Sequence, residues 1–300
     1  VLALGDVRQE FRLLIAPLAD VVAGTATWQQ LADFTDEVTD LDLNGDELHL
    51  LSTRGHPRGR VLKASARTAD LSKATEVVPE SMLVLQSMSR GKDGLYLQAM
   101  DGGLGRLKRL GNNDKLVDVA LPFDGMLTGL AADPTIPGAV MLLSGWLTPS
   151  GVWSVDADGQ VVDAGLTPKP PIDVSPFMTE RRFATAKDGT RIPYDLIYRK
   201  GLKRDGSNPA FISAYGSYGS SGYRPSFAGR TLALIEQGAI VGYAAVRGGG
   251  EYGRDWHRAG KLENKPNTWR DLIAVCEDMI AGGYTAPSQL AIGGRSAGGI

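Results

Sequence analysis

The segment 294–298, Gly-Arg-Ser-Ala-Gly, constrains the fold of this chain more than any other. It follows an apolar run at residues 289–292, and small residues flank the serine. Gly-x-Ser-x-Gly after a strand is typical of a nucleophile elbow, a tight strand-to-helix turn that presents one serine hydroxyl above a parallel sheet. The segment therefore predicts a parallel α/β sheet with Ser296 as a candidate nucleophile. Because the chain contains 38 glycines, a purely structural turn is the alternative.

A seryl nucleophile also requires a general base and a carboxylate that orients the base. In the elbow architecture both follow the serine in the chain, whereas His49, His56 and His257 all precede Ser296. We therefore expect the triad's Asp and His to lie beyond Ile300. We also expect the 300-residue chain by itself to show negligible hydrolytic activity. His257 would act as the base only on an unusual fold.

Composition narrows the class of protein. The chain has 32 basic and 34 acidic residues, which gives no electrostatic case for a nucleic-acid or membrane-surface partner. Cys276 is the single cysteine, so an intrachain disulfide and a Cys-rich metal site are excluded, and we expect no cofactor. No apolar run approaches the roughly 18 residues of a membrane span. Because a leader could precede Val1, cytoplasmic and periplasmic locations both stay open.

Residues 1 to about 166 read as short β-strands separated by turns. Hairpin signals flanked by apolar residues stand at 44–46, 92–94 and 156–159. A similar apolar segment recurs at 45–50, 93–97 and 137–142. A repeat of about 40–50 residues is that of a four-stranded propeller blade, so we predict part of an all-β propeller, with a β-sandwich as the alternative. Three blades cannot close a ring of typically about 4–8, so a propeller implies further sequence.

Residues 167–176 contain four prolines and predict an extended linker. We therefore expect residues 1–170 to form C-terminal blades of a propeller. Residues 171–300 are expected to form the N-terminal part of an α/β-hydrolase domain, truncated after the elbow. Beyond the linker, strands are predicted at 192–198, 210–214, 239–246 and 289–292. Helices are predicted at 226–237 and from a cap at Asn267 or Thr268 to Gly282. This alternation predicts a doubly wound, mostly parallel sheet.

The loop 215–219 follows one of these strands and should lie beside the elbow, because active-site loops leave parallel strands at their carboxyl ends. Acyl transfer requires hydrogen-bond donors aimed at the developing oxyanion. The backbone amide of Ala297 is one candidate donor and the phenol of Tyr215 is the second. For the tyrosine, an aromatic ring packed on the sheet is the alternative.

The glycine-rich segment 247–253 ends another strand, and no Lys-Ser/Thr follows it, so a phosphate-binding loop is not supported. We predict a tight backbone approach there, with Arg247 and Glu251 at the edge of the site as candidate substrate-binding residues. For Glu251, a structural ion pair and a contact to a cationic substrate stand as equal alternatives.

These motifs together resemble the prolyl oligopeptidase family of serine peptidases, which includes oligopeptidase B. The matching segments lie at 187–193, 209–216, 247–253, 256–257, 260–261, 283–287 and 294–299. The resemblance is specific over residues 185–300 and rests on architecture alone over residues 1–170. It implies a propeller that caps a hydrolase domain, with the active site between them and access for short peptides only.

By position, the resemblance implies that Ser296 is the nucleophile and that Ala297 supplies the amide donor. It further implies that the Tyr215 hydroxyl completes the oxyanion hole and that Tyr218 lines the specificity pocket. The expected function is hydrolysis of short peptides through an acyl-enzyme, after Pro or, as in oligopeptidase B, after Arg or Lys. An esterase on the same fold and a propeller binding module beside an inactive hydrolase domain are the alternatives. Oligomeric state stays open.

Overall fold

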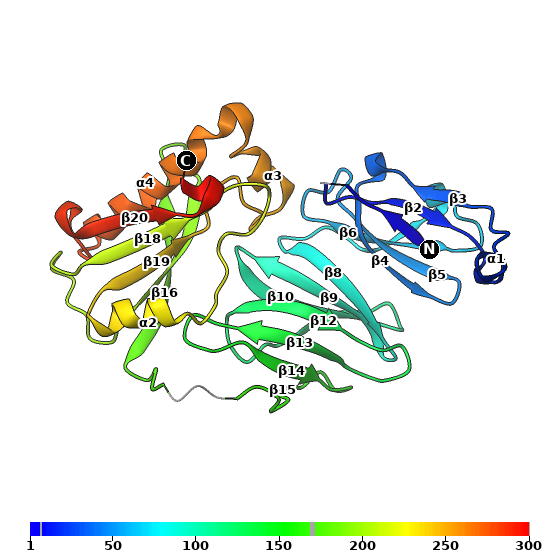
Figure 1. Ribbon diagram of the computed structural model, residues 1–300, viewed down its shortest axis with the longest axis horizontal. Helices are drawn as coiled ribbons and strands as arrows, with labels where there is room; N and C mark the ends of the chain where they lie inside the picture. Colours follow the sequence, from blue (N-terminus) through cyan, green and yellow to red (C-terminus); the bar gives the residue numbers. More distant parts are fainter. Residues whose placement is uncertain (7, 169–171, 300) are drawn as a thin grey trace.

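The computed structural model describes residues 1–6, 8–168 and 172–299. Two lobes are visible, one built of β-sheets up to Asp163 and one α/β lobe that begins at Phe177 (Figure 1). Two prolines of the predicted linker, Pro170 and Pro171, lie outside the described residues, as does the predicted domain boundary between 170 and 171. Within the described ranges, no helix is both long and apolar enough to cross a membrane.

The β lobe contains three four-stranded antiparallel sheets in which neighbouring strands are consecutive in the chain. The first sheet consists of β4 (Val38–Asn44), β5 (Glu47–Ser52), β6 (Arg60–Ser65) and β7 (Thr75–Val78). The second consists of β8 (Val84–Gly91), β9 (Gly94–Asp101), β10 (Leu104–Gly111) and β11 (Leu116–Val119). The third consists of β12 (Met126–Ala131), β13 (Ala139–Ser144), β14 (Gly151–Val155) and β15 (Val161–Asp163).

All three predicted hairpin turns are confirmed, since they join β4 to β5, β8 to β9, and β14 to β15. The recurring apolar segment forms β5, β9 and β13, which are second along the chain in their sheets. Alternate residues of β9 pack in opposite directions, with Leu95 and Leu97 against the first sheet and Tyr96 against the third. Sheets stacked face to face in this way are propeller blades rather than the halves of a sandwich.

A smaller three-stranded sheet precedes the blades. It consists of β1 (Leu2–Leu4), β2 (Arg12–Ile15) and β3 (Gln29–Ala32), with helix α1 (Leu18–Ala23) between the last two strands. Leu13 and Leu31 of this sheet share a core with Leu48 and Leu50 of β5. The sheet therefore packs on the first blade.

The α/β lobe is built on one mixed five-stranded sheet with the order β16-β17-β19-β18-β20. Its strands are β16 (Phe177–Thr185), β17 (Arg191–Arg199), β18 (Ala210–Ala214), β19 (Ile240–Ala244) and β20 (Leu290–Gly294). β18, β19 and β20 are parallel, whereas β16 and β17 pair antiparallel. The strands predicted from 192 to 292 are therefore present, and β16 is an additional strand.

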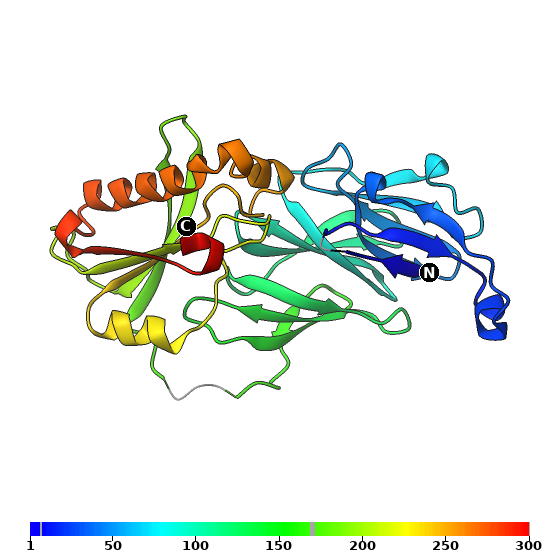
Figure 2. The ribbon, with the colours of Figure 1, turned by 45° about the horizontal axis from the view of Figure 1, so that its top comes forward.

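Helices cover both faces of this sheet (Figure 2). They are α2 (Gly229–Glu236), α3 (Arg254–Arg258) and α4 (Pro266–Ala281), and short 3-10 turns lie at Phe34–Asp36, Leu71–Lys73, Leu262–Asn264, Pro287–Gln289 and Ser296–Gly299. The predicted cap of α4 is wrong by two or three residues, because Pro266 occupies the first turn and Lys265 is the N-cap. Proline suits this position because the first turn has no partner for its missing N–H.

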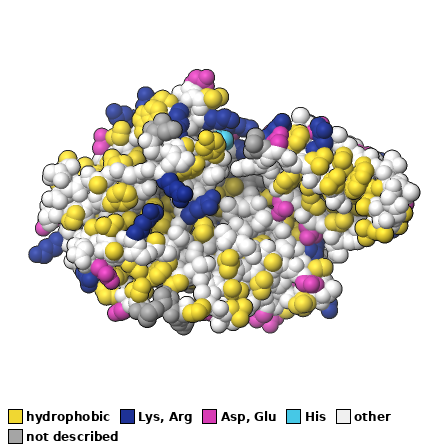
Figure 3. All heavy atoms as spheres, in the orientation of Figure 1, with side chains coloured by type: hydrophobic (Ala, Val, Ile, Leu, Met, Phe, Trp, Pro, Cys, Tyr) yellow, Lys and Arg dark blue, Asp and Glu magenta, His cyan; other side chains and the backbone are white. Residues whose placement is uncertain are grey.

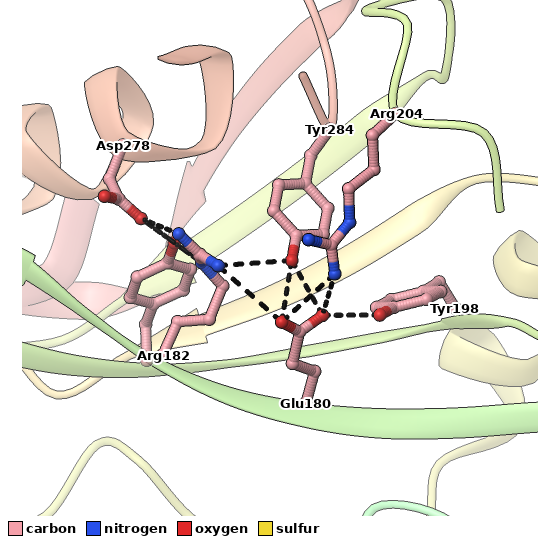
Figure 4. A network of polar contacts seen from close by, with 7 residues as sticks. Glu180, Arg182, Tyr198, Arg204, Asp278 and Tyr284 are labelled. Carbon is pink, nitrogen blue, oxygen red and sulfur yellow. Dashed lines mark hydrogen bonds and ion pairs between the residues drawn. The ribbon is translucent and has the colours of Figure 1, made fainter. Parts of the chain in front are cut away.

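A polar network ties the end of α4 to β16 and β17 (Figure 4). The Arg182 guanidinium donates to Asp278 Oδ2 at 2.9 Å and to the Tyr194 hydroxyl at 2.8 Å. Glu180 accepts the Tyr284 hydroxyl at 2.7 Å and Arg204 Nη2 at 3.0 Å. The network fixes α4 against the sheet, and α4 in turn carries side chains that hold the loop after β19.

The two lobes share a buried contact built around Trp146, which follows β13. Its indole stacks on Tyr243 with ring centroids 4.2 Å apart and donates a 2.7 Å hydrogen bond to Asp195 Oδ2. Ser144 also donates to the carbonyl of Pro225 at 2.9 Å. The third blade therefore docks directly on the sheet of the α/β lobe.

Candidate active site

The parallel strands of the α/β sheet end at one edge, and the candidate catalytic residues follow these ends. Ala214, the last residue of β18, lies opposite Ala244 of β19 and Gly294 of β20. The loop after β18, the glycine-rich loop after β19 and the turn after β20 therefore leave the sheet side by side. This is the edge at which α/β folds bind ligands.

The turn after β20 has the packing of a nucleophile elbow. A Cβ added at Gly294 would overlap the carbonyl oxygen of Gly298, and a Cβ at Gly298 would lie 2.6 Å from the carbonyl oxygen of Ala214. Ser296 has a φ of +53°, a conformation that a residue with a side chain adopts only at an energetic cost. Its side chain is exposed, so the turn presents a strained and accessible serine. Half-buried Ala297 follows directly at the start of the 3-10 turn.

Tyr215 lies against the elbow. The Cβ position of Gly298 is 3.0 Å from Tyr215 Cα and 3.3 Å from its ring. Gly222 encloses the other side of the tyrosine, because a Cβ added at Gly222 would overlap the Cβ of Tyr215. The prediction that the loop after β18 lies beside the elbow is therefore confirmed. The role of Tyr215 as an oxyanion donor stays a prediction.

Tyr218, on the same loop, is 73% exposed and has a φ of +60°. It lines a cavity of about 530 Å³ that opens between the N-terminal residues 8–10 and the loops of the α/β lobe. Phenol rings of this exposure are available to a ligand, as the predicted specificity role requires.

The loops after β18 and β19 approach each other closely. A Cβ at Gly248 would overlap the carbonyl of Gly216, and one at Gly250 would overlap the carbonyl of Gly219. The predicted tight backbone approach is therefore present, and glycine is required there for space.

Arg247 is 6% exposed, and its guanidinium is held by carboxylates. Asp271, which is 0% exposed, accepts from Arg247 Nε at 2.9 Å, from Nη2 at 2.6 Å and from the backbone N–H at 2.9 Å. Asp188 binds the remaining terminal nitrogen, and this hydrogen bond lowers the pKa of Asp188 to about 2. These contacts orient the loop, and a contact between Arg247 and substrate stays a prediction.

Glu251 is 1% exposed and accepts hydrogen bonds from the loop at residues 221–223. Its Oε1 accepts from Gly222 N at 2.9 Å, from Ser221 Oγ at 3.1 Å and from Tyr223 N at 3.3 Å. Burial raises its pKa to about 7. The expected structural ion pair is not found, since no cation among the described residues lies within salt-bridge distance. A contact with a cationic substrate stays a prediction.

Two residues that position the site were missed at the sequence level. Lys265 Nζ donates to Gly216 O at 2.8 Å and to Ser217 Oγ at 2.7 Å, which holds the loop that carries Tyr215. Asp271 holds the loop after β19 from the middle of α4. The sequence contains one signal for Asp271, which lies on the same face of α4 as buried Val275. A carboxylate on a buried helix face needs a partner, so its position indicates a buried ion pair or hydrogen bond.

Described side chains do not include a group of three or more His, Cys, Asp or Glu that could hold a metal ion. His257, in α3, faces the Gly219 backbone and lines the cavity between the lobes. Burial, followed by the charges of nearby basic side chains, lowers its pKa.

Comparisons with known proteins agree with this geometry. The profile of the "Prolyl oligopeptidase family" matches residues 225–300, and that of the "Prolyl oligopeptidase, N-terminal beta-propeller domain" matches residues 16–162. A prolyl endopeptidase of Elizabethkingia meningoseptica is 30% identical over 90% of this chain and 38% of its own length. Dipeptidyl aminopeptidase BI of Pseudoxanthomonas mexicana is 45% identical over 51% of this chain and 21% of its own.

Among solved structures, prolyl oligopeptidase B from Galerina marginata, bound to a 35mer hydrolysis and macrocyclization substrate, superposes with a TM-score of 0.84. It is 25% identical, and the match covers 98% of this chain and 42% of that protein. The chain thus spans about two fifths of the length of such relatives. The chain contains propeller blade sheets, the beginning of an α/β-hydrolase sheet and a strained serine at the predicted position. Together with the matches above, these features show that it belongs to the prolyl oligopeptidase family of serine peptidases.

Proposed function

We propose that the complete protein is a serine oligopeptidase that hydrolyses short peptides through an acyl-enzyme. The observation that carries the proposal is the meeting of two loops at one sheet edge, where the elbow of Ser296 packs directly on Tyr215. Ser296 Oγ attacks the peptide carbonyl and transfers its proton to a base. The Ala297 amide and the Tyr215 hydroxyl then donate to the oxyanion that forms.

We further propose that the two predicted domains have different roles. Residues 1–170 supply blades that restrict access to the site, and residues 171–300 supply the nucleophile and both oxyanion donors. The triad's Asp and His are expected outside these 300 residues, so this segment alone should not turn over substrate. The relatives named above include a prolyl endopeptidase, and cleavage after Pro and cleavage after Arg or Lys are the two specificities to be compared.

The test uses a serine-reactive fluorophosphonate probe and a panel of short peptides on the complete protein. Labelling at Ser296, with loss of both labelling and peptide hydrolysis in Ser296→Ala, is the expected result. Peptides with Pro, Arg or Lys before the scissile bond distinguish the specificities. Hydrolysis of esters but not of peptides would instead support an esterase, and an unlabelled Ser296 would support a binding module.

The inactivity of the isolated segment is tested separately. Robust hydrolysis by residues 1–300 that disappears in Ser296→Ala would contradict it. In that case His257, which is part of the described lobe, would have to supply the base.

A further inference from the structure

The cavity that Tyr218 lines is basic. It measures about 530 Å³, and its charged lining comprises Arg8, Arg254, His257, Lys261 and Lys265 against one carboxylate, Glu10. Lys and Arg side chains gather where the two lobes meet (Figure 3). The lining comes from both lobes, since Arg8 and Glu10 precede β2 and the other charged residues follow β19.

The positive charge of this cavity is only partly balanced. Glu10, the only carboxylate of the lining, forms an ion pair with Arg254, and Glu37 approaches the same guanidinium at 3.8 Å. Arg8 pairs with Asp6 at 3.1 Å. Lys265 is bound to a carbonyl and a hydroxyl, neither of which carries charge. For Lys261 and Lys265, no carboxylate in the described part of the chain lies within salt-bridge distance.

The same cations lie close enough to His257 to act on its imidazole. Its pKa is lowered first by burial and then by the charges of Lys261, Arg254, Arg258 and Lys265. Several cations therefore act together on one point of the cavity wall. Two of them, Lys261 and Lys265, are also without an acidic partner among the described residues.

We propose that this basic cavity is a subsite that binds a carboxylate of the peptide substrate. The inference rests on the proposed peptidase function and specifies its substrate. Ser217 and Tyr218 line the cavity and belong to the loop that carries Tyr215. A peptide held at Ser296 therefore passes close to these cations. A carboxylate compensates the unbalanced lysines, whereas a free amino terminus is repelled, so the carboxyl-terminal end of a short peptide is the part that suits the cavity.

The test compares matched peptides on the complete protein. One pair has the same sequence with a free or an amidated carboxyl terminus, and a second pair, amidated throughout, carries Asp or Asn at one position after the scissile bond. We expect roughly 10-fold higher kcat/KM for the free acid than for the amide, as for a hydrogen-bonded charge pair that is partly shielded from water. A preference confined to the Asp/Asn pair would assign the carboxylate to a side chain instead of the terminus.

Two variants from different lobes localise the effect. Lys261→Gln removes an exposed ammonium that forms no described ion pair, and Arg8→Gln removes a cation of the other lobe. Each should reduce the acid-to-amide ratio towards one. Lys200→Gln is the matched control, because Lys200 is exposed after β17 at the opposite edge of the sheet, and it should retain the full ratio.

Equal kcat/KM within both peptide pairs, or a preference that survives both Lys261→Gln and Arg8→Gln, would overturn the subsite. Failure of the proposed function looks different, because no peptide would then be cleaved. In that case calorimetric binding of the same acid and amide peptides to Ser296→Ala decides the subsite. Tighter binding of the acid in Ser296→Ala, reduced by adding Lys261→Gln, would support it, and equal binding would reject it.

Discussion

A phenolic hydroxyl and a backbone amide are the two donors proposed for the oxyanion, and the first can be removed without changing the shape of the side chain. Tyr215→Phe in the complete protein should reduce kcat about 10²–10³-fold, the usual effect of losing one such donor. Labelling of Ser296 by the fluorophosphonate probe should persist. Unchanged turnover would remove Tyr215 from the proposed mechanism, and steady-state kinetics on a cleaved peptide measure the effect.

The buried Glu251 carboxyl makes stability depend on pH. Its pKa is about 7 in the folded protein against an ordinary 4.5, so between these values the folded state binds more protons than the unfolded state. Stability should therefore fall as pH rises through this window, by up to about 3 kcal/mol. All three of its hydrogen bonds reach Oε1, whereas Oε2 has no partner among the described residues, which suits the neutral acid.

Glu251→Gln keeps the acceptor at Oε1 and removes the titration. The free energy of unfolding in urea should then vary less between pH 4.5 and 7 than in the parent. Glu236→Gln, at an exposed position of α2, is the control and should leave the parent's slope unchanged. An identical slope in Glu251→Gln and in the parent would show that the carboxyl is ionised throughout.

The positions of single residues were predictable where a local motif surrounds them, whereas their catalytic roles stay predictions. Ser296 and Ala297 belong to a five-residue pattern whose geometry is local, and Tyr215 follows a strand directly. The partners of Arg247 were not predictable, because Asp271 is 24 positions away and Asp188 is 59 positions away. Pairing over such distances depends on how β17, β19 and α4 pack.

Among the elements, the elbow depends on two close backbone contacts. Gly298→Ala places a methyl group 2.6 Å from the carbonyl oxygen of Ala214 and 3.0 Å from Tyr215 Cα, so β18 and the turn must separate. Both fluorophosphonate labelling and peptide hydrolysis should fall by at least about 10-fold, because small displacements at a reacting centre have large effects on rate.

The control for this prediction is one residue further along. A Cβ at Gly299 would lie 3.4 Å from its nearest neighbour, an ordinary contact, so Gly299→Ala should label close to the parent rate. Equal labelling of Gly298→Ala and the parent would mean that the elbow is looser than its packing indicates.

Strands and helices were predictable where turn residues or apolar periodicity mark them. Strands without such marks were harder to predict from their composition. The hairpin turns and the strand before the tyrosine loop have unambiguous local signals. β16 has no such signal, because its sequence carries Glu180, Arg181 and Arg182 in its centre. Arg182 and Glu180 have partners in α4 and in the loop before β18, and Arg181 donates to the carbonyl of Gly102 in the β lobe. A local pattern does not reveal such partners. The helix cap was misplaced because Pro266 begins the helix without a side-chain cap.

For the whole molecule, the lobes are coupled through Trp146. Trp146→Phe removes the donor to Asp195 Oδ2 and leaves a buried carboxyl whose other oxygen already has no described partner. Burial raises the pKa of Asp195 to about 6, so the charged form is already disfavoured there. The variant should lose about 1–3 kcal/mol of stability at pH 7.

Hydrogen exchange of the amides in β17 and in the segment after β13 measures this loss, since both should exchange faster. Adding Asp195→Asn to Trp146→Phe should restore part of the protection. Trp153→Phe, which alters a ring that packs within the third blade, should leave β17 unaffected. Unchanged exchange in Trp146→Phe would show that the lobes are held by other contacts.

The repeat of 40–50 residues was enough to predict blades, because each blade is built from neighbouring segments of the chain. The docking of the third blade on the α/β sheet was not predictable. It joins Trp146 to Asp195 and Tyr243, which are distant in sequence and carry no shared motif.

The pairing of Ala214 with Gly294 has a consequence for biosynthesis. These residues are 80 positions apart, and β19 and α4 must form between them before the sheet edge is complete. At about 5–20 residues per second, a ribosome needs roughly 4–16 s to bridge this interval. During that time Tyr215 has already been synthesised but has no serine beside it. In the proposed mechanism the nucleophile therefore meets its oxyanion donor only once β20 has joined β18, and the expected Asp and His complete the site later still.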